Sequence, residues 1–244
     1  VAVDSEVVMP APTPSLGKPS LSPWLLVGAA IAALGLMYAP FLIARAPIEP
    51  VMGPVQKIFY FHVPCAWLLL LSTLVAGGGS LTYLFKGSAK GDRLALAAAE
   101  LGAVFGIAAL VSGPLWGKVA WGKYWTWDAR QTSTLLLWLV LLAYLLARKY
   151  GGPAARKLAA ALALFAAADV PLVYASVRIW RTLHPDNSVV KTLDPAMRPA
   201  FYTSLLVLTV FWGVLLALRL RLEELRAGIN DLHIAVEDAE EAHS

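Results

Sequence analysis

The sequence predicts an all-α membrane protein whose chain crosses the bilayer six times. Of its 244 residues, 59% are hydrophobic and 15% are charged, whereas soluble domains average roughly 45–50% apolar and about 25% charged residues. The chain also contains several nearly uncharged runs close to the ~20 residues that a helix needs to cross the hydrocarbon layer. No run alternates apolar and polar residues as a barrel strand does, so the spans should be helices.

The first predicted element is a disordered tail over residues 1–23, which are rich in proline and lack the continuous apolar core of a signal peptide. Two of the spans that follow contain a carboxylate, Glu100 or Asp169. Because charges are costly in lipid, we expect both to face the bundle interior and to hydrogen-bond a neighbouring helix, with a proton path as the alternative. The six predicted spans are residues 24–44, 63–85, 94–115, 132–147, 158–177 and 199–218.

Basic loops predict the orientation of the chain. The loops after the second and fourth spans are rich in basic residues, namely Lys86, Lys90, Arg93, Arg148, Lys149, Arg156 and Lys157. Such loops stay in the cytoplasm, which places both termini inside and the loops after spans one, three and five outside. Residues 220–244 then form a cytoplasmic amphipathic helix and tail, since apolar residues recur every three or four positions. Packing against a partner and a solvated tail remain equally open.

Several chemistries are excluded by the residues themselves. Cys65 is the single cysteine, so the chain has no internal disulfide, no CxxC redox pair and no C-x-x-C-H haem-attachment motif; it is expected to pack at a helix start. The run GPLWGK at residues 113–118 lacks the spacing and the Ser or Thr of a phosphate-binding loop, so no site for ATP hydrolysis is expected. No nucleic-acid motif is present, and the net charge of +4 is small.

Two histidines fall in the loops predicted to lie outside. The first loop ends in KIFYFHVPCAW, which places His62 at the mouth of the second span, and the third contains RIWRTLHPDN, with His184 just beyond the fifth span. Neutral imidazole is a strong ligand for haem iron, and two rings approaching from opposite faces would give a six-coordinate site. The alternative is that each histidine is a polar helix cap at the headgroup level.

The remaining outer loop, residues 114–132, is rich in tryptophan and closes with Asp128. Four tryptophans fall within twelve residues: Trp116, Trp121, Trp125 and Trp127. Every membrane interface has an aromatic belt, but this density favours an apolar shelf on which a flat macrocycle could lie. Cations favour carboxylates, so the candidate partners of haem propionates are the basic residues of the outer loops: Lys118, Lys123, Arg130, Arg178 and Arg181.

These motifs resemble the tryptophan-rich "WWD" family of haem-handling membrane proteins, and within it the haem exporter C branch of bacterial cytochrome c maturation. The resemblance also includes KIFYFHVPxAW around His62 and the LHP motif at His184, and it covers most of residues 24–219. Gln131 departs from the usual aliphatic residue, and Trp180 stands alone where two adjacent tryptophans are common. The family pattern WGxxWxWDxRxT is matched by Trp121, Gly122, Trp125, Trp127, Asp128, Arg130 and Thr132.

The resemblance implies a haem-delivery protein of the bacterial inner membrane, without enzymatic turnover. His62 and His184 would be the axial ligands of a non-covalently bound haem b. The family's partners are a periplasmic haem chaperone, ABC transporter subunits that drive release of the loaded chaperone, and a small membrane accessory subunit. The residues implied to line the porphyrin are Trp116, Trp121, Trp125, Trp127, Asp128 and Arg130.

Two other classes of protein remain alternatives. An electron-transfer cytochrome of b type would also use two histidines, but it normally pairs them on facing helices inside the bilayer. A non-haem small-molecule transporter would place its site near the membrane midplane, around Glu100 and Asp169; no inverted repeat supports it. The larger haem lyases of the WWD family have many more spans.

Overall fold

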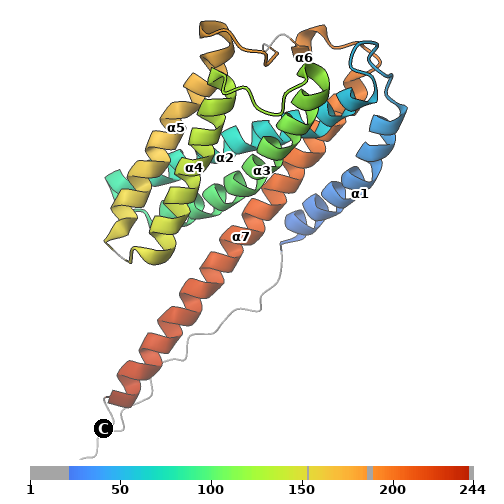
Figure 1. Ribbon diagram of the computed structural model, residues 1–244. Helices are drawn as coiled ribbons and strands as arrows, with labels where there is room; N and C mark the ends of the chain where they lie inside the picture. Colours follow the sequence, from blue (N-terminus) through green and yellow to red (C-terminus); the bar gives the residue numbers. More distant parts are fainter. Residues whose placement is uncertain (1–21, 153, 186–188, 242–244) are drawn as a thin grey trace, which may run out of the picture.

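The computed structural model describes residues 22–152, 154–185 and 189–241 as a bundle of long helices (Figure 1). The tail predicted for residues 1–23 lies outside this part of the chain, apart from Ser22, which caps the first helix, and Pro23, which begins it. Six helices are long and apolar enough to cross a membrane, which confirms the predicted number. They are α1 (Pro23–Arg45), α2 (Phe59–Lys86), α3 (Ala89–Trp121), α4 (Ala129–Tyr150), α5 (Ala155–Ile179) and α7 (Arg198–Glu241).

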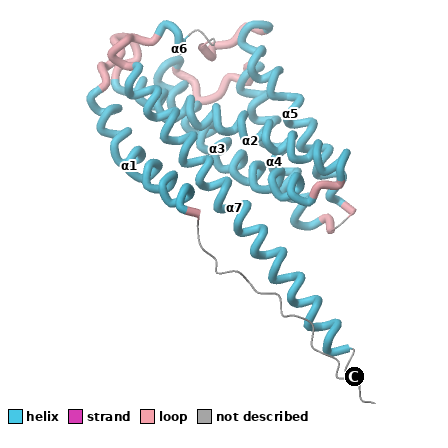
Figure 2. The backbone as a smooth tube through the Cα atoms, turned by 180° about the vertical axis from the view of Figure 1, so that it is seen from behind, coloured by secondary structure: helices cyan, strands magenta, loops and turns pink. Residues whose placement is uncertain are grey.

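Two short helices complete the described chain. The 3-10 helix η1 (Pro54–Ile58) leads directly into α2, and α6 (Val189–Thr192) precedes α7. The helices α2 and α3 pack along each other at the centre of the bundle, with α4 and α5 on one side and α7 on the other, while α1 packs against α7 (Figures 1 and 2). The contact between α2 and α3 includes many small buried residues, which let helix backbones approach closely in a membrane: Ala76, Gly79, Ala95, Ala98, Ala99 and Gly102.

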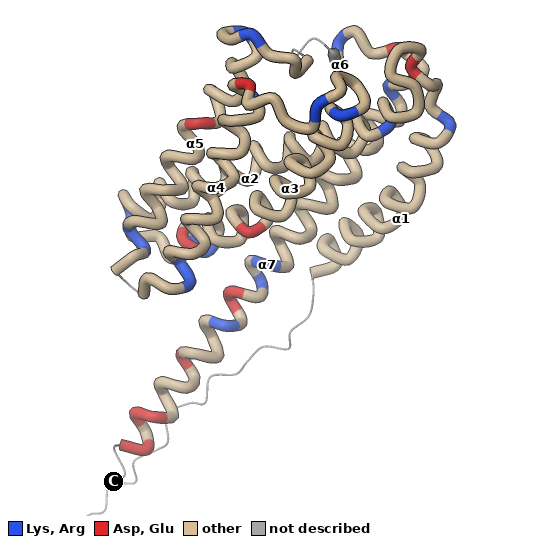
Figure 3. The backbone as a smooth tube through the Cα atoms, viewed as in Figure 1, with Lys and Arg blue, Asp and Glu red and all other residues tan. Residues whose placement is uncertain are grey.

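Tryptophan side chains also tie the helices together. The indole N–H of Trp138 on α4 donates to the Ala103 carbonyl of α3 at 2.9 Å, and that of Trp212 on α7 donates to Ser72 Oγ of α2 at 2.8 Å. Charged residues gather at the two ends of the bundle, whereas most of its middle is uncharged (Figure 3). This distribution is the one expected of helices that pass through hydrocarbon.

The loops after α1, α3 and α5 meet at one end of the bundle. A single apolar cluster there joins all three regions, since it contains Ala46 after α1, Trp116 of α3 and Leu193 after α6. This end, which carries His62 and His184, is the histidine end. The start of α1 and the last part of α7 lie toward the opposite end (Figure 2). Which end faces the cytoplasm stays a prediction from the basic loops.

The predicted C-terminal amphipathic helix is not a separate element. The last span continues without a break into it, so that α7 is 44 residues long and extends well beyond the bundle (Figure 1). Ion pairs hold the junction: the Arg219 guanidinium contacts Glu223 one turn later and Glu100 of α3, with Nη2 at 2.8 Å from Glu100 Oε1. This contact confirms the prediction that Glu100 bonds to a neighbouring helix.

Asp169 is buried in α5, as predicted, with 8% of its surface exposed. Its Oδ2 atom, however, has no hydrogen-bond partner among the described residues. Within this part of the chain, Oδ2 therefore does not accept the hydrogen bond from a neighbouring helix that we expected for Asp169.

A bidentate ion pair at the end opposite the histidines is expected to stabilise the fold. Arg148 of α4 donates through Nη1 and Nη2 to the two carboxylate oxygens of Asp92 on α3, at 2.6 and 2.9 Å, and both side chains are mostly buried. Because Arg148→Ala leaves a buried carboxylate without a partner, we expect it to destabilise the protein by about 3 kcal/mol. Thermal melting in detergent would measure this, and the Asp92→Leu/Arg148→Ala double variant, which leaves no orphan charge, should melt higher than Arg148→Ala. Equal or lower melting of the double variant would contradict the explanation.

Candidate functional site

His62 lies in the first turn of α2. The helix begins at Phe59, before the predicted span, because apolar composition marks where the chain enters the hydrocarbon and not where helical hydrogen bonding starts. The half-buried His62 ring meets the Trp116 indole edge to face, with ring centroids 6.0 Å apart and planes at 66°. Its Nδ1 atom is 3.1 Å from Ser112 Oγ on α3. Residues of α3 therefore contact the ring at two points.

His184 lies in the connection between α5 and α6. Its backbone N–H donates to Thr182 Oγ1 at 3.0 Å, and its ring Nδ1 is 2.9 Å from the Pro185 carbonyl oxygen. Burial and the nearby Arg130 guanidinium lower the pKa of His184 from its ordinary value, against the opposing effects of the Pro185 carbonyl and of Asp128. The ring is therefore neutral at pH 7, which is the form that binds metal.

The structure brings the two histidines to the same site. His62, His184 and Arg130 lie within electrostatic range of one another, and Asp128 lies within range of His184 and Arg130. These residues are far apart in the sequence and come from α2, the α5–α6 connection and the start of α4. This arrangement is consistent with the prediction that the loops after the first, third and fifth spans lie on one side of the membrane.

The tryptophan-rich segment is more helical than predicted. Helix α3 continues through Pro114 to Trp121, and it ends at Gly122, whose left-handed conformation (φ 76°) closes the helix through an N–H bond to the Lys118 carbonyl. Residues 114–121 and 129–132, predicted as loop, are therefore helical, and the connection is limited to residues 122–128. Proline is tolerated in transmembrane helices because neighbouring groups satisfy the freed carbonyl, so Pro114 does not end α3.

The tryptophans form two groups rather than one continuous shelf. Trp116 is buried between Phe59 and His62 and meets Trp121 at a centroid distance of 6.5 Å. Trp125 and Trp127 meet edge to face at 5.6 Å in the connection after α3. Among the described residues, Trp116 is the one of the four tryptophans whose ring packs against a site histidine, so the predicted shelf is divided between a helical pair and a loop pair.

Trp127 has the most exceptional backbone of the described residues. It is the single non-glycine residue there with positive φ, at 56°, and 71% of its surface is exposed. A bulky residue in the left-handed region is strained, and such strain is found chiefly at functional sites. Trp127 therefore combines a strained backbone with an exposed aromatic ring, directly before Asp128.

Asp128 and Gln131 organise the turn that begins α4. Asp128 is the N-cap: its Oδ1 accepts from the Gln131 N–H at 3.0 Å, and its Oδ2 accepts from Thr126 Oγ1 at 3.1 Å. Gln131 Oε1 accepts from the Thr126 N–H at 2.9 Å. Side-chain caps of this kind fix the entry of a helix, so Asp128 positions Arg130 near both histidines, and Gln131, the departure from the family pattern, has a structural use.

Arg130 is the one of the five candidate propionate partners that lies within electrostatic range of both histidines. Lys118 instead donates to the Gly122 carbonyl at 3.2 Å, and Arg178 lies over the Tyr174 ring at 6.0 Å. Lys123 and Arg181 are exposed. The Arg130 atom Nη1 is buried and has no hydrogen-bond partner among the described residues.

Unpaired donors at this end show which ligand the site would suit. Within the described chain, Trp116 Nε1 and Trp125 Nε1 are, like Arg130 Nη1, buried without an acceptor. Unpaired buried donors cost about 1–3 kcal/mol each, and carboxylate oxygens would satisfy them. The set of two imidazoles, aromatic rings and the half-buried Arg130 guanidinium fits a flat iron macrocycle that carries carboxylates.

Gly113 gives the His62 ring its space. A Cβ atom at this position would lie 2.9 Å from His62 Cε1, a distance at which the ring must move. We therefore expect Gly113→Ala to displace His62 from Ser112 and to weaken haem binding in a spectroscopic titration. Gly78→Ala on α2, where a Cβ meets nothing within 4 Å, is the matched control, and a Gly113→Ala protein that binds haem as tightly as this control would contradict the prediction.

Sequence reasoning missed Ser112 and Phe59. Phe59 links the site to α7, with its ring 6.0 Å from Trp116 and 5.1 Å from Phe201. Ser112 precedes the GPLWGK run by one residue, and its contact with His62 crosses 50 positions of sequence. Ser112 carries no local signal, because a serine within an apolar helix is common and only the packing of α2 against α3 shows its partner. Phe59 lies within the KIFYFHVPCAW motif, but the motif alone does not show that its ring contacts α7.

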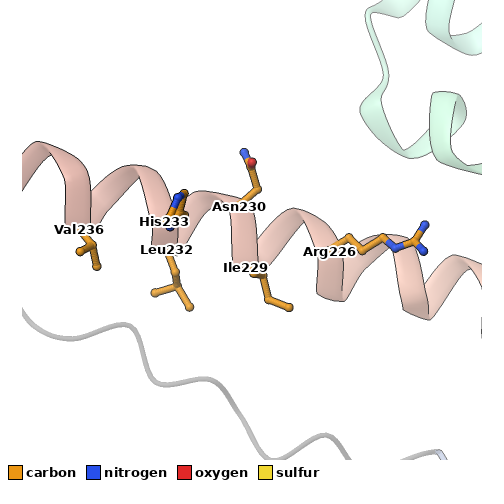
Figure 4. Close-up of a pocket in the computed structure, with 6 residues that line it drawn as sticks. All are labelled: Arg226, Ile229, Asn230, Leu232, His233 and Val236. Atoms are coloured by element: carbon orange, nitrogen blue, oxygen red, sulfur yellow. The ribbon is translucent and has the colours of Figure 1, made fainter. Parts of the chain in front are cut away.

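A shallow groove on α7 lies away from this site. Its lining side chains all come from the part of the helix beyond the bundle (Figure 4), where His233 pairs with Glu237 at 3.2 Å. Across the described ranges, no group of three or more His, Cys, Asp or Glu side chains could hold a metal ion. The groove is lined by Arg226, Ile229, Asn230, Leu232, His233 and Val236.

The fold and the site define a polytopic α-helical membrane protein with a paired-histidine, tryptophan-rich site at one end. The chain belongs to the haem exporter protein C family, because the model of that family, described as "Heme exporter protein C", matches residues 10–239. This confirms the resemblance based on the WGxxWxWDxRxT pattern and places the chain among proteins of haem handling in cytochrome c biogenesis.

Individual relatives agree with the family model. The chain is 38% identical over 196 residues to the haem exporter protein C of Bradyrhizobium diazoefficiens, covering 79% of this chain and 73% of that protein. It is 31% identical over 209 residues to the protein of the same name in Escherichia coli K12, covering 82% of each. A mitochondrial protein of Arabidopsis thaliana, whose name refers to cytochrome c biosynthesis, is 32% identical over 144 residues, which are 59% of this chain and 55% of that protein.

Proposed function

We propose that this protein binds haem non-covalently at its histidine end, at the outer face of the bacterial inner membrane, and delivers it to a periplasmic haem chaperone. The observation that carries the proposal is that His62, His184 and Arg130 lie at one end of the bundle within electrostatic range of one another. Two imidazoles would serve as ligands of the haem iron, and the Arg130 guanidinium would pair with the haem carboxylates. The basic loops at the opposite end support the outward orientation.

Each residue of the site has a distinct part in this proposal. His62 and His184 supply ring nitrogens to the iron, while Trp116 and Phe59 support the His62 side with aromatic surface. Arg130 and the free indole N–H groups of Trp116 and Trp125 provide donors for the propionates. Bound haem supplies the iron and porphyrin that the chaperone will carry. The protein contributes positioning and electrostatics, without catalytic turnover and without hydrolysing ATP.

Hand-over needs access from outside the membrane, and the site's exposed rim supports such access. Trp127 exposes most of its surface, next to the site residues Trp125 and Asp128. A chaperone docking on this rim would approach the haem without entering the bundle. ABC transporter subunits and a small membrane accessory subunit are the further partners that we propose for the complete release cycle.

Haem transfer in a reconstituted system tests the proposal. We expect the haem-loaded protein in nanodiscs to transfer haem to the apo-chaperone of the same organism with no nucleotide present. Covalent haem on the chaperone, detected by mass after denaturation, is the readout. Failure of the chaperone to acquire haem from a loaded protein would refute the delivery step, and failure of the protein to bind haem would refute the whole proposal. Asp128→Ala, which removes the cap that positions Arg130, should reduce the yield.

A further inference from the structure

We infer that Ser112 sets the tautomer of His62 and so presents the Nε2 atom of that ring to haem. The inference rests on the proposed function for its ligand, but it concerns a residue to which no role has been assigned above. Ser112 is buried on α3, one turn before Trp116, and its Oγ lies 3.1 Å from His62 Nδ1. It is a positioning residue, because it acts on the ring and not on the iron.

The direction of the hydrogen bond follows from the other neighbours of Ser112. The carbonyl oxygens of Ala108 and Ala109 lie 2.7 and 3.3 Å from its Oγ. A carbonyl has no hydrogen to give, so the 2.7 Å contact requires that Ser112 donates its single hydrogen to Ala108. The hydroxyl oxygen can then only accept from His62. The hydrogen of the neutral His62 ring is therefore on Nδ1, and the lone pair is on Nε2.

His184 reaches the same tautomer through a different acceptor. Its Nδ1 lies 2.9 Å from the Pro185 carbonyl oxygen, which again can only accept, so the ring hydrogen is on Nδ1. Both rings thus keep Nε2 free although one is held by a serine hydroxyl and the other by a backbone carbonyl. Partners of this kind fix the tautomer and orientation of metal-binding histidines and raise their basicity. The agreement between two unrelated contacts points to ligation through both Nε2 atoms.

Packing around His62 limits the ring to this orientation. Trp116 lies against one side of the ring, and the missing side chain of Gly113 lets Cε1 approach α3 closely. A ring turned over by 180° would direct its Nδ1 away from Ser112. Without the Ser112 hydroxyl, His62 Nδ1 loses the acceptor that lies 3.1 Å away. The Ala109 backbone remains as a hydrogen-bond partner of the ring, and the two neutral tautomers become closer in free energy.

The ring tautomers of the haem-free protein test the inference directly. The chain has four histidines, so protein labelled with 15N-histidine gives a simple NMR spectrum in which His62→Ala identifies the His62 signals. We expect His62 to be protonated on Nδ1 in the unchanged protein and to shift toward the Nε2-protonated form in Ser112→Ala. Haem titration of Ser112→Ala should show binding weaker by roughly 10- to 100-fold, the usual effect of removing a hydrogen-bond partner of a metal ligand.

Two further variants separate this role from general packing. Ser112→Thr keeps the hydroxyl and should retain both the Nδ1-protonated ring and most of the affinity. Ser204→Ala removes another buried serine, whose hydroxyl donates to the Ala200 carbonyl of its own helix at 2.8 Å, and should change neither. The inference is overturned if His62 in Ser112→Ala keeps its tautomer, or if Ser112→Thr behaves like Ser112→Ala. Failure of the unchanged protein to take up haem would instead refute the proposed function, while the NMR result would still decide the role of Ser112.

Discussion

Replacing His62 or His184 by alanine is expected to abolish the low-spin haem spectrum of the purified protein. Each ring is the proposed source of one axial ligand, and no other histidine of the described chain has been placed at this end. Removing the ligand itself should cost more affinity than the roughly 10- to 100-fold lost with a ligand's hydrogen-bond partner. Absorption spectra during haem titration measure both the affinity and the coordination state.

A third histidine, His233, provides a control for the two alanine variants. His233 is exposed on the extension of α7, where it pairs with Glu237, so His233→Ala should bind haem as the unchanged protein does. A five-coordinate spectrum in either single variant would show that the other histidine still holds the iron. Unchanged low-spin spectra in both His62→Ala and His184→Ala would remove both residues from the site.

Replacing Arg130 by glutamine is expected to weaken haem binding by about 10- to 100-fold. A hydrogen bond to a charged group contributes about 1.5–3 kcal/mol, and 1.4 kcal/mol corresponds to a factor of about ten in affinity. Arg130 Nη1 is buried and has no partner in the described part of the chain, so the guanidinium is available for a propionate. Equilibrium titration in detergent measures the change.

Haem dimethyl ester shows whether Arg130 acts on a propionate. The ester lacks the carboxylate charges, so the unchanged protein should bind it less tightly than haem, whereas Arg130→Gln should bind the two with similar affinity. Arg178→Gln is the matched control. Arg178 is exposed in the last turn of α5, where it lies over the Tyr174 ring, so its replacement removes the same charge without removing Arg130. If the preference for haem over its ester were as large in Arg130→Gln as in the unchanged protein, the propionate assignment would be wrong.

The sequence predicted the membrane helices well because their signal is local. Apolar runs identified all six spans, and most boundaries moved by only a few residues. The largest shifts are at α3, which continues to Trp121, and at α7, which continues to Glu241. The extension of α3 is rich in aromatic residues, and the extension of α7 is amphipathic. Both lie outside the apolar runs, so hydropathy does not reveal that they are helical.

The candidate site was predicted less completely. The order of the spans places the loops of His62 and His184 on the same side of the membrane, but only the structure shows that Arg130 lies within electrostatic range of both rings. The family resemblance implies that Asp128 lines the porphyrin, but its capping of α4 depends on side-chain geometry that no sequence pattern reports. Ser112 escaped attention because its contact with His62 joins distant parts of the chain.

The most direct test of the central proposal is the absorption spectrum of the purified, unchanged protein in nanodiscs after addition of one equivalent of haem. A bis-histidine site at the meeting point of His62 and His184 predicts stoichiometric uptake and a low-spin, six-coordinate spectrum with sharp α and β bands on reduction. No uptake of haem, or a high-spin spectrum with one histidine ligand, would contradict it.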